Sequence, residues 1–430
     1  MRKYSVLLLS IYLMITSSCT MAMSVPTNFV LVTDDTISGV TRINTTTNTV
    51  EAFIPTLAPA FGIAVAPGAM FAYASIGTLD AVVRIDLATN MVDLTIPVGL
   101  TPNIVAINPA GTQVWVLNAG SSDISVIDIA SNTVVRTITL PGNSEPGGIV
   151  FTPDGINVYI SARLNLAVYE LNVATGNVIA TIPISPDPVG LTITPDGKTV
   201  YVATFMFGGH TVIPISTATN TAGAPIDVGG EPDQLAISAD GKTLYVTNTT
   251  SNPGNVQTVD TATNTAGTTI PVGITQPSQP VGIALTFDGT TLYVALNMDD
   301  FSVVPIDVAT GAVGAEIFIG GAINGPRLIA APPFPPQAQN PTAMVTSDNL
   351  LDVAICGITI QWLPVGSSQV TSYQIFQNGI LIGTVQATDP LTFTTFVSVC
   401  GSFCVLTNQS FSISSVTSNG ATAQVPVVIL

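Results

Sequence analysis

The sequence predicts an all-β protein whose main part is a ring of repeated four-stranded units. Two observations lead to this prediction: a turn signal recurs about every 43 residues, and each copy lies between short apolar strands. The composition is a third, because only 8% of the 430 residues are charged while 47% are hydrophobic. Few charges together with many Thr, Ser, Asn, Gly and Pro favour short strands and turns over helices, whose surfaces usually carry Lys, Glu and Arg.

Each repeated unit opens with a hairpin whose turn carries glycine. The step from Gly68 to Gly111 is 43 residues, and later copies follow at similar steps. Gly and Asp tolerate the positive φ that tight turns require, so an Asp-Gly pair between two β-rich runs is a strong hairpin signal. The turns are Ala66-Pro67-Gly68, Asn108-Pro109-Ala110-Gly111, Pro153-Asp154-Gly155, Pro195-Asp196-Gly197, Ala239-Asp240-Gly241 and Phe287-Asp288-Gly289. The aromatic strands that follow them are Phe71-Ala72-Tyr73, Val114-Trp115-Val116, Val158-Tyr159-Ile160, Val200-Tyr201-Val202, Leu244-Tyr245-Val246 and Leu292-Tyr293-Val294.

A second hairpin follows in the unit, with Asp and Thr ahead of a permissive Asn or Gly. The Asp and Thr side chains can bond back to nearby amides and close the turn. Copies of this hairpin lie at Val83–Asn90, Val126–Asn132, Val259–Asn264 and Pro305–Gly311. A further strand then runs into a Pro-Val-Gly exit. Each unit thus holds four strands in about 43 residues, which is the size of one propeller blade.

The repeat resembles the YVTN-type β-propeller repeat, named for the strand that reads Tyr245-Val246-Thr247-Asn248 in this chain. The resemblance covers residues 28 to 331, with Ala203 and Ala295 standing where the name predicts Thr. The aromatic strand occurs seven times once Phe29-Val30-Leu31-Val32 is included as the first copy. The resemblance therefore implies a seven-bladed β-propeller, which we place at residues 24–331.

The first and last copies of the repeat are incomplete and complement each other. The first copy lacks its opening strand and Asp-Gly turn, while Pro326–Ala330 matches an opening strand with nothing after it. A ring closed by strands from both ends leaves no blade unpaired at the seam. We predict that residues 28–54 supply three strands of the closing blade and residues 326–331 its innermost strand.

The first 22 residues have the pattern of a secretory signal peptide. Two basic residues precede the apolar stretch Val6–Ile15, and a small, polar segment ends at Ala22. We expect cleavage after Ala22; the alternative is a lipid anchor at Cys19, because the residues before it end like a lipobox. Either route predicts a secreted, periplasmic or cell-surface protein. Beyond this segment no apolar run approaches the ~20 residues that a membrane-spanning helix needs.

The charge of the chain is strongly negative. The formal net charge is −17, and loss of two basic residues with the signal peptide leaves 7 basic and 26 acidic residues, or −19. Such a surface repels nucleic acid and anionic lipid headgroups, so we expect neither as a partner. A cationic or neutral ligand fits better, and acidity would also keep an exported protein soluble.

The C-terminal part of the chain departs from the repeat. Consecutive prolines begin a semi-rigid linker at residues 332–340. Residues 341–430 contain alternating strand candidates and an Asn378-Gly379 hairpin signal, which suit a β-sandwich. The Trp362-Leu363-Pro364 segment and the run Ser372–Gly379 resemble a fibronectin type III domain, with Phe411 where that family usually carries Tyr.

Three of the four cysteines, Cys356, Cys400 and Cys404, lie in this C-terminal module. An exported protein meets oxidising conditions, so we expect a disulfide. The resemblance implies that the second strand pairs with the fifth, which favours Cys356–Cys400, while Cys356–Cys404 and Cys400–Cys404 remain open. A catalytic role for these thiols is disfavoured, because the module has no histidine to activate a thiolate.

The propeller offers one cluster of candidate site residues. The positions that precede the inner strands surround the channel in propellers, so three successive blades place Glu145, Asp187 and Glu231 around one mouth. Converging carboxylates could hold Ca²⁺ or attract a cationic ligand; the alternative is three separate solvated charges. No other cofactor is indicated. The only histidine, His210, excludes multi-histidine zinc, copper and non-haem iron sites and makes a Ser-His-Asp or Cys-His pair hard to build.

These features favour an exported, non-enzymatic binding or scaffold protein that recognises a protein, glycan or small ligand through the propeller faces. The resemblance to seven-bladed lactonases implies a hydrolase as an alternative, for which only Glu145, Glu231 and Arg163 could be offered. A periplasmic redox partner, similar to the propeller subunit of amine dehydrogenases, is a further alternative, although the chain lacks Cys-His haem-attachment motifs.

Overall fold

The computed structural model describes the propeller and a set of C-terminal strands. Its described residues are 28–205, 210–251, 253–273, 279–286, 288–297, 301–320, 326–332, 353–361, 370–377, 380–386, 392–400, 411–417, 420–421 and 425–427. Within these ranges the regular structure is β, apart from the 3-10 turn η1 (Gly77–Leu79). In the same ranges no helix is long and apolar enough to cross a membrane. The propeller lies within residues 25–341, and the strands beyond it are described separately.

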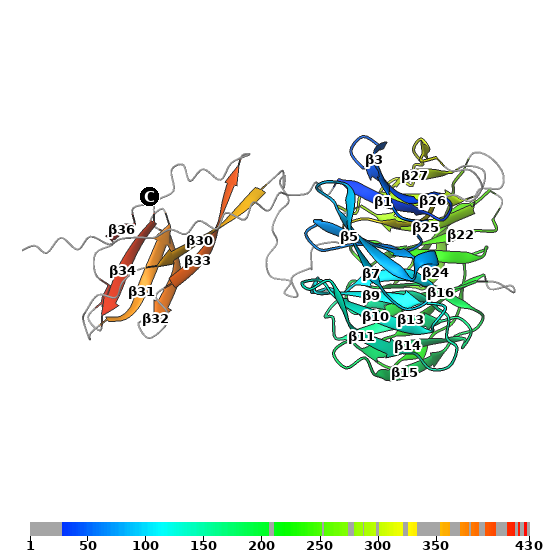
Figure 1. Cartoon of the computed structure of the whole chain (residues 1–430), viewed down its shortest axis with the longest axis horizontal. Coiled ribbons are helices and arrows are strands. Elements are labelled where there is room, and N and C mark those ends of the chain that lie inside the picture. The colour runs from blue at the N-terminus through cyan, green and yellow to red at the C-terminus, as the bar shows by residue number, and fades with distance from the viewer. Residues whose placement is uncertain are drawn as a thin grey trace, which may run out of the picture. The chain divides into compact units, whose positions relative to one another are not determined.

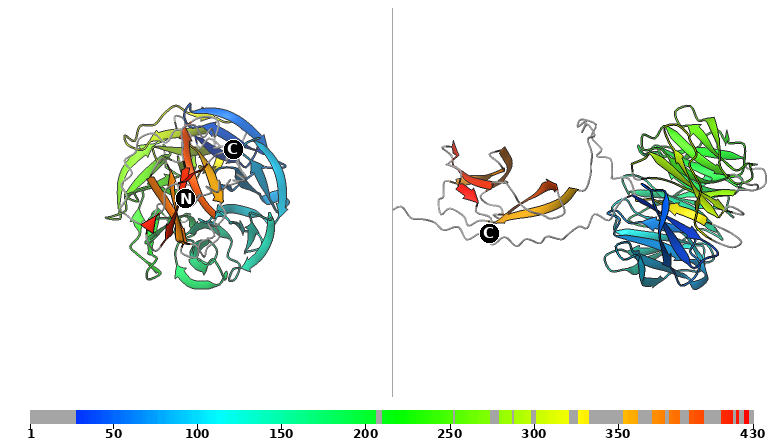
Figure 2. Two further views of the ribbon diagram at one scale, coloured as in Figure 1. Left: turned by 90° about the vertical axis from the view of Figure 1, so that its left-hand side faces the viewer. Right: turned by 90° about the horizontal axis from the view of Figure 1, so that it is seen from above.

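Seven antiparallel sheets follow one another around a central axis (Figure 1). The colours run round this ring from blue through cyan and green to yellow in Figure 2, left. The seven-bladed β-propeller predicted from the repeat is therefore confirmed. Each innermost strand contacts the innermost strand of the next blade, and the last contacts the first, so the ring is closed.

The blades are numbered here in chain order, with the closing blade first. The strands of blades 2 to 4 are β4 (Ile63–Val65), β5 (Phe71–Ile76), β6 (Ala81–Asp86) and β7 (Met91–Pro97); β8 (Pro102–Ile107), β9 (Gln113–Asn118), β10 (Asp123–Asp128) and β11 (Thr133–Thr139); and β12 (Pro146–Phe151), β13 (Asn157–Ala162), β14 (Ala167–Asn172) and β15 (Val178–Pro183). Those of blades 5 to 7 are β16 (Pro188–Ile193), β17 (Thr199–Thr204), β18 (Thr211–Ser216), β19 (Thr221–Ala222) and β20 (Ile226–Asp227); β21 (Pro232–Ile237), β22 (Thr243–Asn248), β23 (Asn255–Asp260) and β24 (Thr265–Pro271); and β25 (Gln279–Leu285), β26 (Thr291–Asn297), β27 (Ser302–Asp307) and β28 (Ile317–Phe318).

The closing blade combines strands from both ends of the propeller, as the two incomplete repeats predict. Its strand order is β29 (Pro326–Ala330), β1 (Phe29–Asp34), β2 (Gly39–Asn44) and β3 (Thr49–Pro55). The strands β1 and β29 pair antiparallel, with Leu31 opposite Ala330. The ring is thus held shut by backbone hydrogen bonds between segments almost 300 residues apart in the chain.

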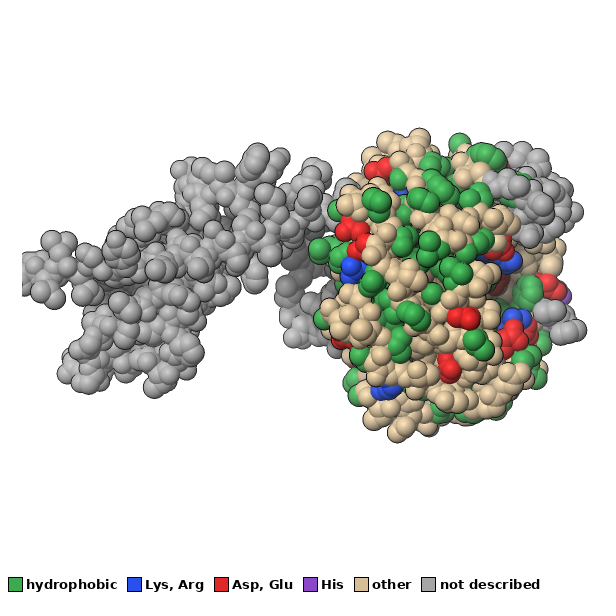
Figure 3. Space-filling view, in the orientation of Figure 1, with side chains coloured by type: hydrophobic (Ala, Val, Ile, Leu, Met, Phe, Trp, Pro, Cys, Tyr) green, Lys and Arg blue, Asp and Glu red, His purple; other side chains and the backbone are tan. Residues whose placement is uncertain are grey.

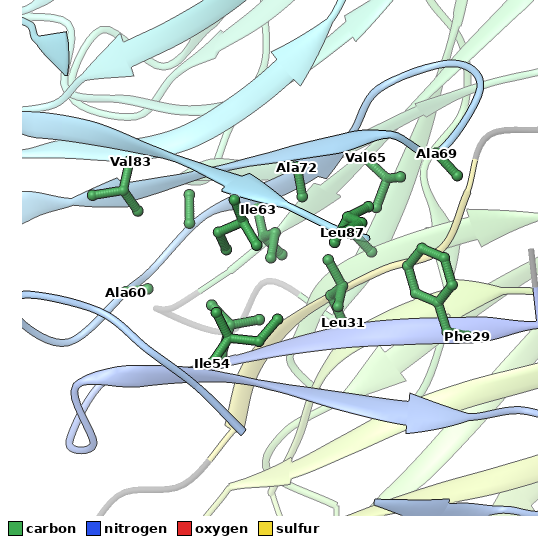
Figure 4. Close-up of a cluster of buried hydrophobic side chains, with 14 of the residues drawn as sticks. Phe29, Leu31, Ile54, Ala60, Ile63, Val65, Ala69, Ala72, Val83 and Leu87 are labelled. Carbon is green, nitrogen blue, oxygen red and sulfur yellow. The ribbon is translucent and has the colours of Figure 1, made fainter. Parts of the chain in front are cut away.

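Burial explains why the aromatic strands of the repeat read as continuous apolar runs. The second strand of each blade is covered on both faces, as in β9, where Val114 to Asn118 are all buried. The fourth strand lies at the rim and alternates between half-buried and exposed residues, as in β11. Figure 4 shows the resulting core between neighbouring blades: Phe29, Leu31 and Ile54 of the closing blade pack with residues of blade 2.

Buried tyrosines of the aromatic strands tie neighbouring blades together. Four of these five tyrosines, all except Tyr245, donate the hydroxyl hydrogen to an Asn that ends a hairpin turn in the next blade. The pairs are Tyr73–Asn132 at 3.2 Å, Tyr159–Asn220 at 3.0 Å, Tyr201–Asn264 at 2.7 Å, and Tyr293–Asn48. These Asn residues have φ near +54°, the left-handed conformation that Asn tolerates. The recurring Tyr and the recurring Asn of the sequence are therefore two halves of one inter-blade bond.

The C-terminal strands form two separate pairing sets. One joins β30 (Val353–Gln361) to β33 (Thr392–Cys400), and the other joins β31 (Val370–Gln377), β32 (Ile380–Gln386), β34 (Phe411–Thr417), β35 (Gly420–Ala421) and β36 (Val425–Val427). In the first set Cys356 lies opposite Val397, and Val353 lies opposite Cys400. Cys404, the signal peptide and the linker fall outside the described residues, so the disulfide and the fibronectin-like module stay predictions.

A ligand cavity in the central channel

One face of the propeller gathers the loops that surround the channel. The innermost strand of every blade starts at this face, and the second strand returns to it. The sequence-predicted residues Glu145 and Asp187 precede β12 and β16, and Arg163 directly follows β13. The Asp-Gly turns lie at the opposite ends of these strands. There the Asp side chains bond within their own turns, as Asp154 does with the Ile156 amide at 2.9 Å.

Arg163 brings two of the three predicted carboxylates together. Its Nη1 lies 3.1 Å from Glu145 Oε1, and its Nη2 lies 2.9 Å from Asp187 Oδ2. Arg163 Nε donates a further bond to Asp187, at 3.1 Å. The Asp187 side chain is only 14% exposed, against 37% for Glu145, so the bidentate Asp187 pair is the better shielded. Hydrogen bonding to Asp187 raises the pKa of Arg163 above its usual value.

The third predicted carboxylate, Glu231, is not joined to this pair by any interaction among the described residues. Its backbone is fixed by Thr249 and Thr250, whose groups bond to its carbonyl and amide. Within the described ranges, no three His, Cys, Asp or Glu side chains gather where they could hold a metal ion. The structure thus assigns Glu145 and Asp187 an arginine partner, whereas calcium at this mouth stays a proposal.

Glu145 has an unusual backbone conformation. Its φ is +44°, in the left-handed region that a non-glycine residue seldom adopts. Thr101, at the equivalent position of blade 3, has a φ of +50°, so this conformation belongs to the turn that precedes the innermost strand. It places the Glu145 carboxylate on Arg163 at the mouth of the channel.

Below this mouth, the channel contains a cavity lined by equivalent positions of all seven blades. Each blade contributes to the lining the residue directly after its blade-opening position, and in six of the blades the residue at that position is proline. We call these residues the channel ring: Phe61, Asn103, Gly147, Val189, Asp233, Val281 and Arg327. Ile104, Arg163, Phe205, Gln234 and Leu328 complete the lining, and the cavity volume is about 200 Å³.

The channel ring is positioned by hydroxyl groups at the Thr place of the aromatic strand. Each hydroxyl donates a hydrogen bond to a carbonyl of the channel ring in the next blade. The bonds run from Thr33 to Phe61 at 2.7 Å, Ser75 to Asn103 at 2.7 Å, Ser161 to Val189 at 2.8 Å and Thr247 to Val281 at 2.9 Å. Leu117, Ala203 and Ala295 stand at the same place in the other blades and cannot make this bond. The repeat therefore encodes the geometry of the cavity in part.

Glycines next to the channel ring allow the innermost strands to approach closely. A Cβ atom at Gly190 would lie 2.3 Å from the carbonyl oxygen of Asp233, and one at Gly148 would lie 2.3 Å from that of Val189. Real Cβ atoms do not approach carbonyl oxygens so closely, so only glycine fits at these two positions.

Asp233 is the interior carboxylate of the cavity. Burial raises its pKa to about 6, against the opposing effects of a hydrogen bond from Gln234 and the charges of Arg327 and Arg163. The bond from Gln234 Nε2 is long, at 3.4 Å. No arginine of the described residues forms an ion pair with Asp233. The carboxylate therefore lies half-buried in the channel with little compensation for its desolvation, which is typical of a functional position.

Arg327 is the second channel-ring residue that carries a charge. Its Nε donates to Asp35, and its guanidinium lies 5.4 Å from the centre of the Phe61 ring. All three nitrogens of Arg163 donate a hydrogen bond, whereas Nη1 and Nη2 of Arg327 have no hydrogen-bond partner among the described residues. Arg327 can therefore still donate hydrogen bonds into the cavity.

Two larger hollows lie away from the channel. One is a groove of about 520 Å³ beside Arg136 and Ile156, and the other, of about 550 Å³, lies between Leu57, which follows the outer strand β3, and Met91 of the outer strand β7. Neither contains a buried carboxylate. In the view of Figure 3, charged side chains are scattered among apolar and uncharged polar ones over the side of the propeller. The smaller cavity is the better candidate because, among the three hollows, only its lining includes both a carboxylate and guanidinium groups.

Asp233, Arg327 and Asn103 were not among the residues predicted from the sequence. The prediction considered the residue just before each blade-opening proline, whereas the cavity is lined by the residue just after that proline. A comparison of the residues that follow the blade-opening prolines would have found all three, because charged or amide side chains stand there among apolar ones.

Comparisons with known proteins support the fold. No family model and no curated protein matches the chain. Among solved structures, a functionally unknown protein of Desulfotomaculum acetoxidans is 18% identical, with a TM-score of 0.61 over 71% of this chain and 100% of that one. Hydrazine synthase of Kuenenia stuttgartiensis is 21% identical, with a TM-score of 0.57 over 64% of this chain and 90% of that one. A candidate 6-phosphogluconolactonase of Bacteroides uniformis is 19% identical, with a TM-score of 0.55 over 70% and 99%.

These identities are low, so the likeness concerns the fold alone. The fold and the cavity together define the chain as a seven-bladed β-propeller with a polar site at one end of its channel.

Proposed function

We propose that this protein binds a small ligand in the channel cavity of the propeller and has no catalytic role. The observation that supports this most strongly is the convergence of equivalent positions of all seven blades on one cavity whose lining includes the half-buried Asp233. An interior carboxylate destabilises a folded protein unless a partner offsets its desolvation. The presence of Asp233 in the channel therefore favours a role for this residue in binding a ligand. The mouth residues Glu145 and Asp187 hold Arg163 at the cavity wall, which orients one of its polar groups.

A thermal-shift screen tests this proposal. The full chain would be melted with amino acids, aliphatic amines, carboxylates, sugars and calcium chloride, each at millimolar concentration. A ligand at 100 times its Kd stabilises a protein by about 2.7 kcal/mol, which corresponds to a melting shift of several degrees. We expect at least one class to produce such a shift.

The same screen on two matched variants locates the site. Asp233→Asn should abolish or reduce the shift, whereas Asp154→Asn, the same change in an exposed turn at the far end of the channel, should retain it. A panel without any shift, or a shift equal in both variants, would contradict binding in the channel cavity. A shift with calcium alone that is lost in Glu231→Gln would instead support calcium at the mouth.

A hydrolase is the second candidate function, and one observation favours it. A carboxyl group with a pKa of about 6 can act as a general acid or base near neutral pH, and the guanidinium groups of the cavity could stabilise developing negative charge. A lactone-hydrolysis panel with the wild type and Asp233→Asn separates the two functions. Turnover that the variant loses would support the hydrolase, and absence of turnover supports the binding protein.

We further propose that the propeller belongs to the YVTN type and acts outside the cytoplasm, followed by a fibronectin-like module that carries one disulfide. The sequence features that support export are the N-terminal signal pattern and the three C-terminal cysteines. Mass spectrometry of the mature protein tests this, since cleavage after Ala22 and lipidation at Cys19 give different masses. A protein that retains residues 1–22 in its native host would refute export by this route.

A further inference from the structure

The channel cavity presents two opposite charges that are not paired with each other. Asp233 and Arg327 occupy equivalent ring positions, separated by the Val281 position of blade 7. Neither forms an ion pair with the other within the described part of the chain. A carboxylate and a guanidinium that line one small cavity would normally pair, because both groups are half-buried and therefore partly desolvated there. Both line the same cavity, so one ligand in it can contact both groups.

Both groups also keep open hydrogen-bonding positions. Asp233 receives only the long bond from the amide of its neighbour Gln234. Arg327 uses Nε on Asp35, which leaves its two terminal nitrogens for a ligand. A carboxylate accepts hydrogen bonds from an ammonium group, and a guanidinium fork donates a pair of bonds to a carboxylate.

The rest of the lining is largely apolar. The side chains of Phe61, Phe205 and Val281 contribute to the wall, together with Ile104 and Leu328. A cavity of about 200 Å³ corresponds to six or seven liquid water molecules at about 30 Å³ each, so it suits a ligand of about six to ten non-hydrogen atoms. The cavity therefore combines Asp233 and Arg327 with a wall that is apolar apart from Asn103, Arg163 and Gln234.

We infer that the ligand of the channel cavity is a small zwitterion with an apolar side group, of the chemical class of the aliphatic α-amino acids. Its ammonium group would bind Asp233 and its carboxylate would bind Arg327. A simple anion would leave the charge of Asp233 without a partner, and a simple amine would do the same to Arg327. This inference rests on the proposed binding function and specifies its ligand.

Isothermal titration calorimetry with three related probes tests the inference. The probes are L-leucine, isopentylamine, which lacks its carboxylate, and isocaproate, which lacks its ammonium group. Each would be titrated into the full chain at pH 7.5. A hydrogen bond between charged groups contributes enough that we expect both analogues to bind about 10- to 100-fold more weakly than leucine.

Two variants assign each end of the ligand. Asp233→Asn should weaken leucine about 10-fold or more and leave isocaproate unchanged, whereas Arg327→Gln should weaken leucine and leave isopentylamine unchanged. Asp154→Asn is the matched control and should bind all three probes as the wild type does. The analogue series on the wild type gives an independent result if a variant proves to be unfolded by circular dichroism.

The outcomes separate this inference from the proposed function. An analogue that binds as tightly as leucine overturns the zwitterion and leaves a channel ligand of another class. The same holds if leucine does not bind while another compound of the thermal-shift panel binds in an Asp233-dependent way. Absence of binding by every compound overturns both.

Discussion

Replacement of Asp233 by Asn should stabilise the propeller at neutral pH, although it alters an interior residue. Burial raises the pKa of this carboxyl from its ordinary value near 4 to about 6 in the folded protein. A group whose pKa is higher in the folded state favours folding when it is protonated. That contribution is fully present below about pH 4 and is lost as the pH rises through about 6. At pH 7 and above, ionised Asp233 therefore opposes folding.

The magnitude follows from the size of this pKa change. A difference of about two pKa units at about 1.4 kcal/mol each corresponds to at most about 3 kcal/mol at pH 8. The neutral amide of Asn avoids the ionisation and keeps nearly the same shape. We expect Asp233→Asn to exceed the wild type by about 1–3 kcal/mol in free energy of unfolding at pH 8, with little difference at pH 4.

Urea denaturation followed by tryptophan fluorescence at pH 4, 6 and 8 measures this effect. Asp154→Asn is the control and should show no comparable gain at pH 8. An Asp233 variant that is less stable than the wild type at pH 8, or whose stability difference is the same at all three pH values, would refute the assignment of Asp233 as an uncompensated interior carboxylate.

Three further predictions concern the repeat itself. Tyr201→Phe should lower the free energy of unfolding by about 1 kcal/mol, because it removes a buried inter-blade hydrogen bond. Tyr245→Phe is the control, since the Tyr245 hydroxyl has no such partner in the described part of the next blade, and it should have a much smaller effect in the same urea titration. Equal effects of the two substitutions would contradict the role of the Tyr–Asn pairs. Gly190→Ala should destabilise the propeller by several kcal/mol and weaken ligand binding, since its Cβ would meet the Asp233 carbonyl at 2.3 Å; a variant with unchanged melting temperature and binding would show that the strands can move apart. Acid should destabilise the propeller through the hairpin turns that carry Asp260 and its equivalents. Turn amides and hydroxyls bond to these carboxylates and lower their pKa values in the folded protein. Their stabilising contribution is therefore present above about pH 4 and is lost as the pH falls below it. A melting temperature that stays constant from pH 5 to pH 2.5 would contradict this last prediction.

The sequence predicted the blades because a propeller is built from local hairpins, each with its own turn chemistry. Even the closing blade could be inferred. The opening strand near Leu328 is not followed by the other strands of a blade, and the aromatic strand at Leu31 is not preceded by an opening strand. The inter-blade pairs were harder to foresee. The hydroxyl of Tyr201 and the side chain of Asn264 lie more than 60 residues apart, and only the ring brings them together.

The sequence placed the candidate residues at the mouth of the channel, whereas the cavity that we propose as the site lies below that mouth. Glu145 and Asp187 do lie together, yet their partner Arg163 comes from a different loop, which spacing alone does not reveal. The importance of Asp233 depends on its burial and on the absence of an ion pair, and neither property is local. The pairing of Arg327 with Asp35 likewise joins opposite ends of the propeller sequence.

The most direct test of the central claim is a crystal structure of the protein with the tightest ligand of the screening panel. We predict electron density for the ligand inside the channel cavity, within hydrogen-bonding distance of the Asp233 carboxylate and of Arg327. Ligand density in an outer groove, such as the one beside Leu57 and Met91, with ordered water alone around Asp233, would contradict the claim that the channel ring is a binding site.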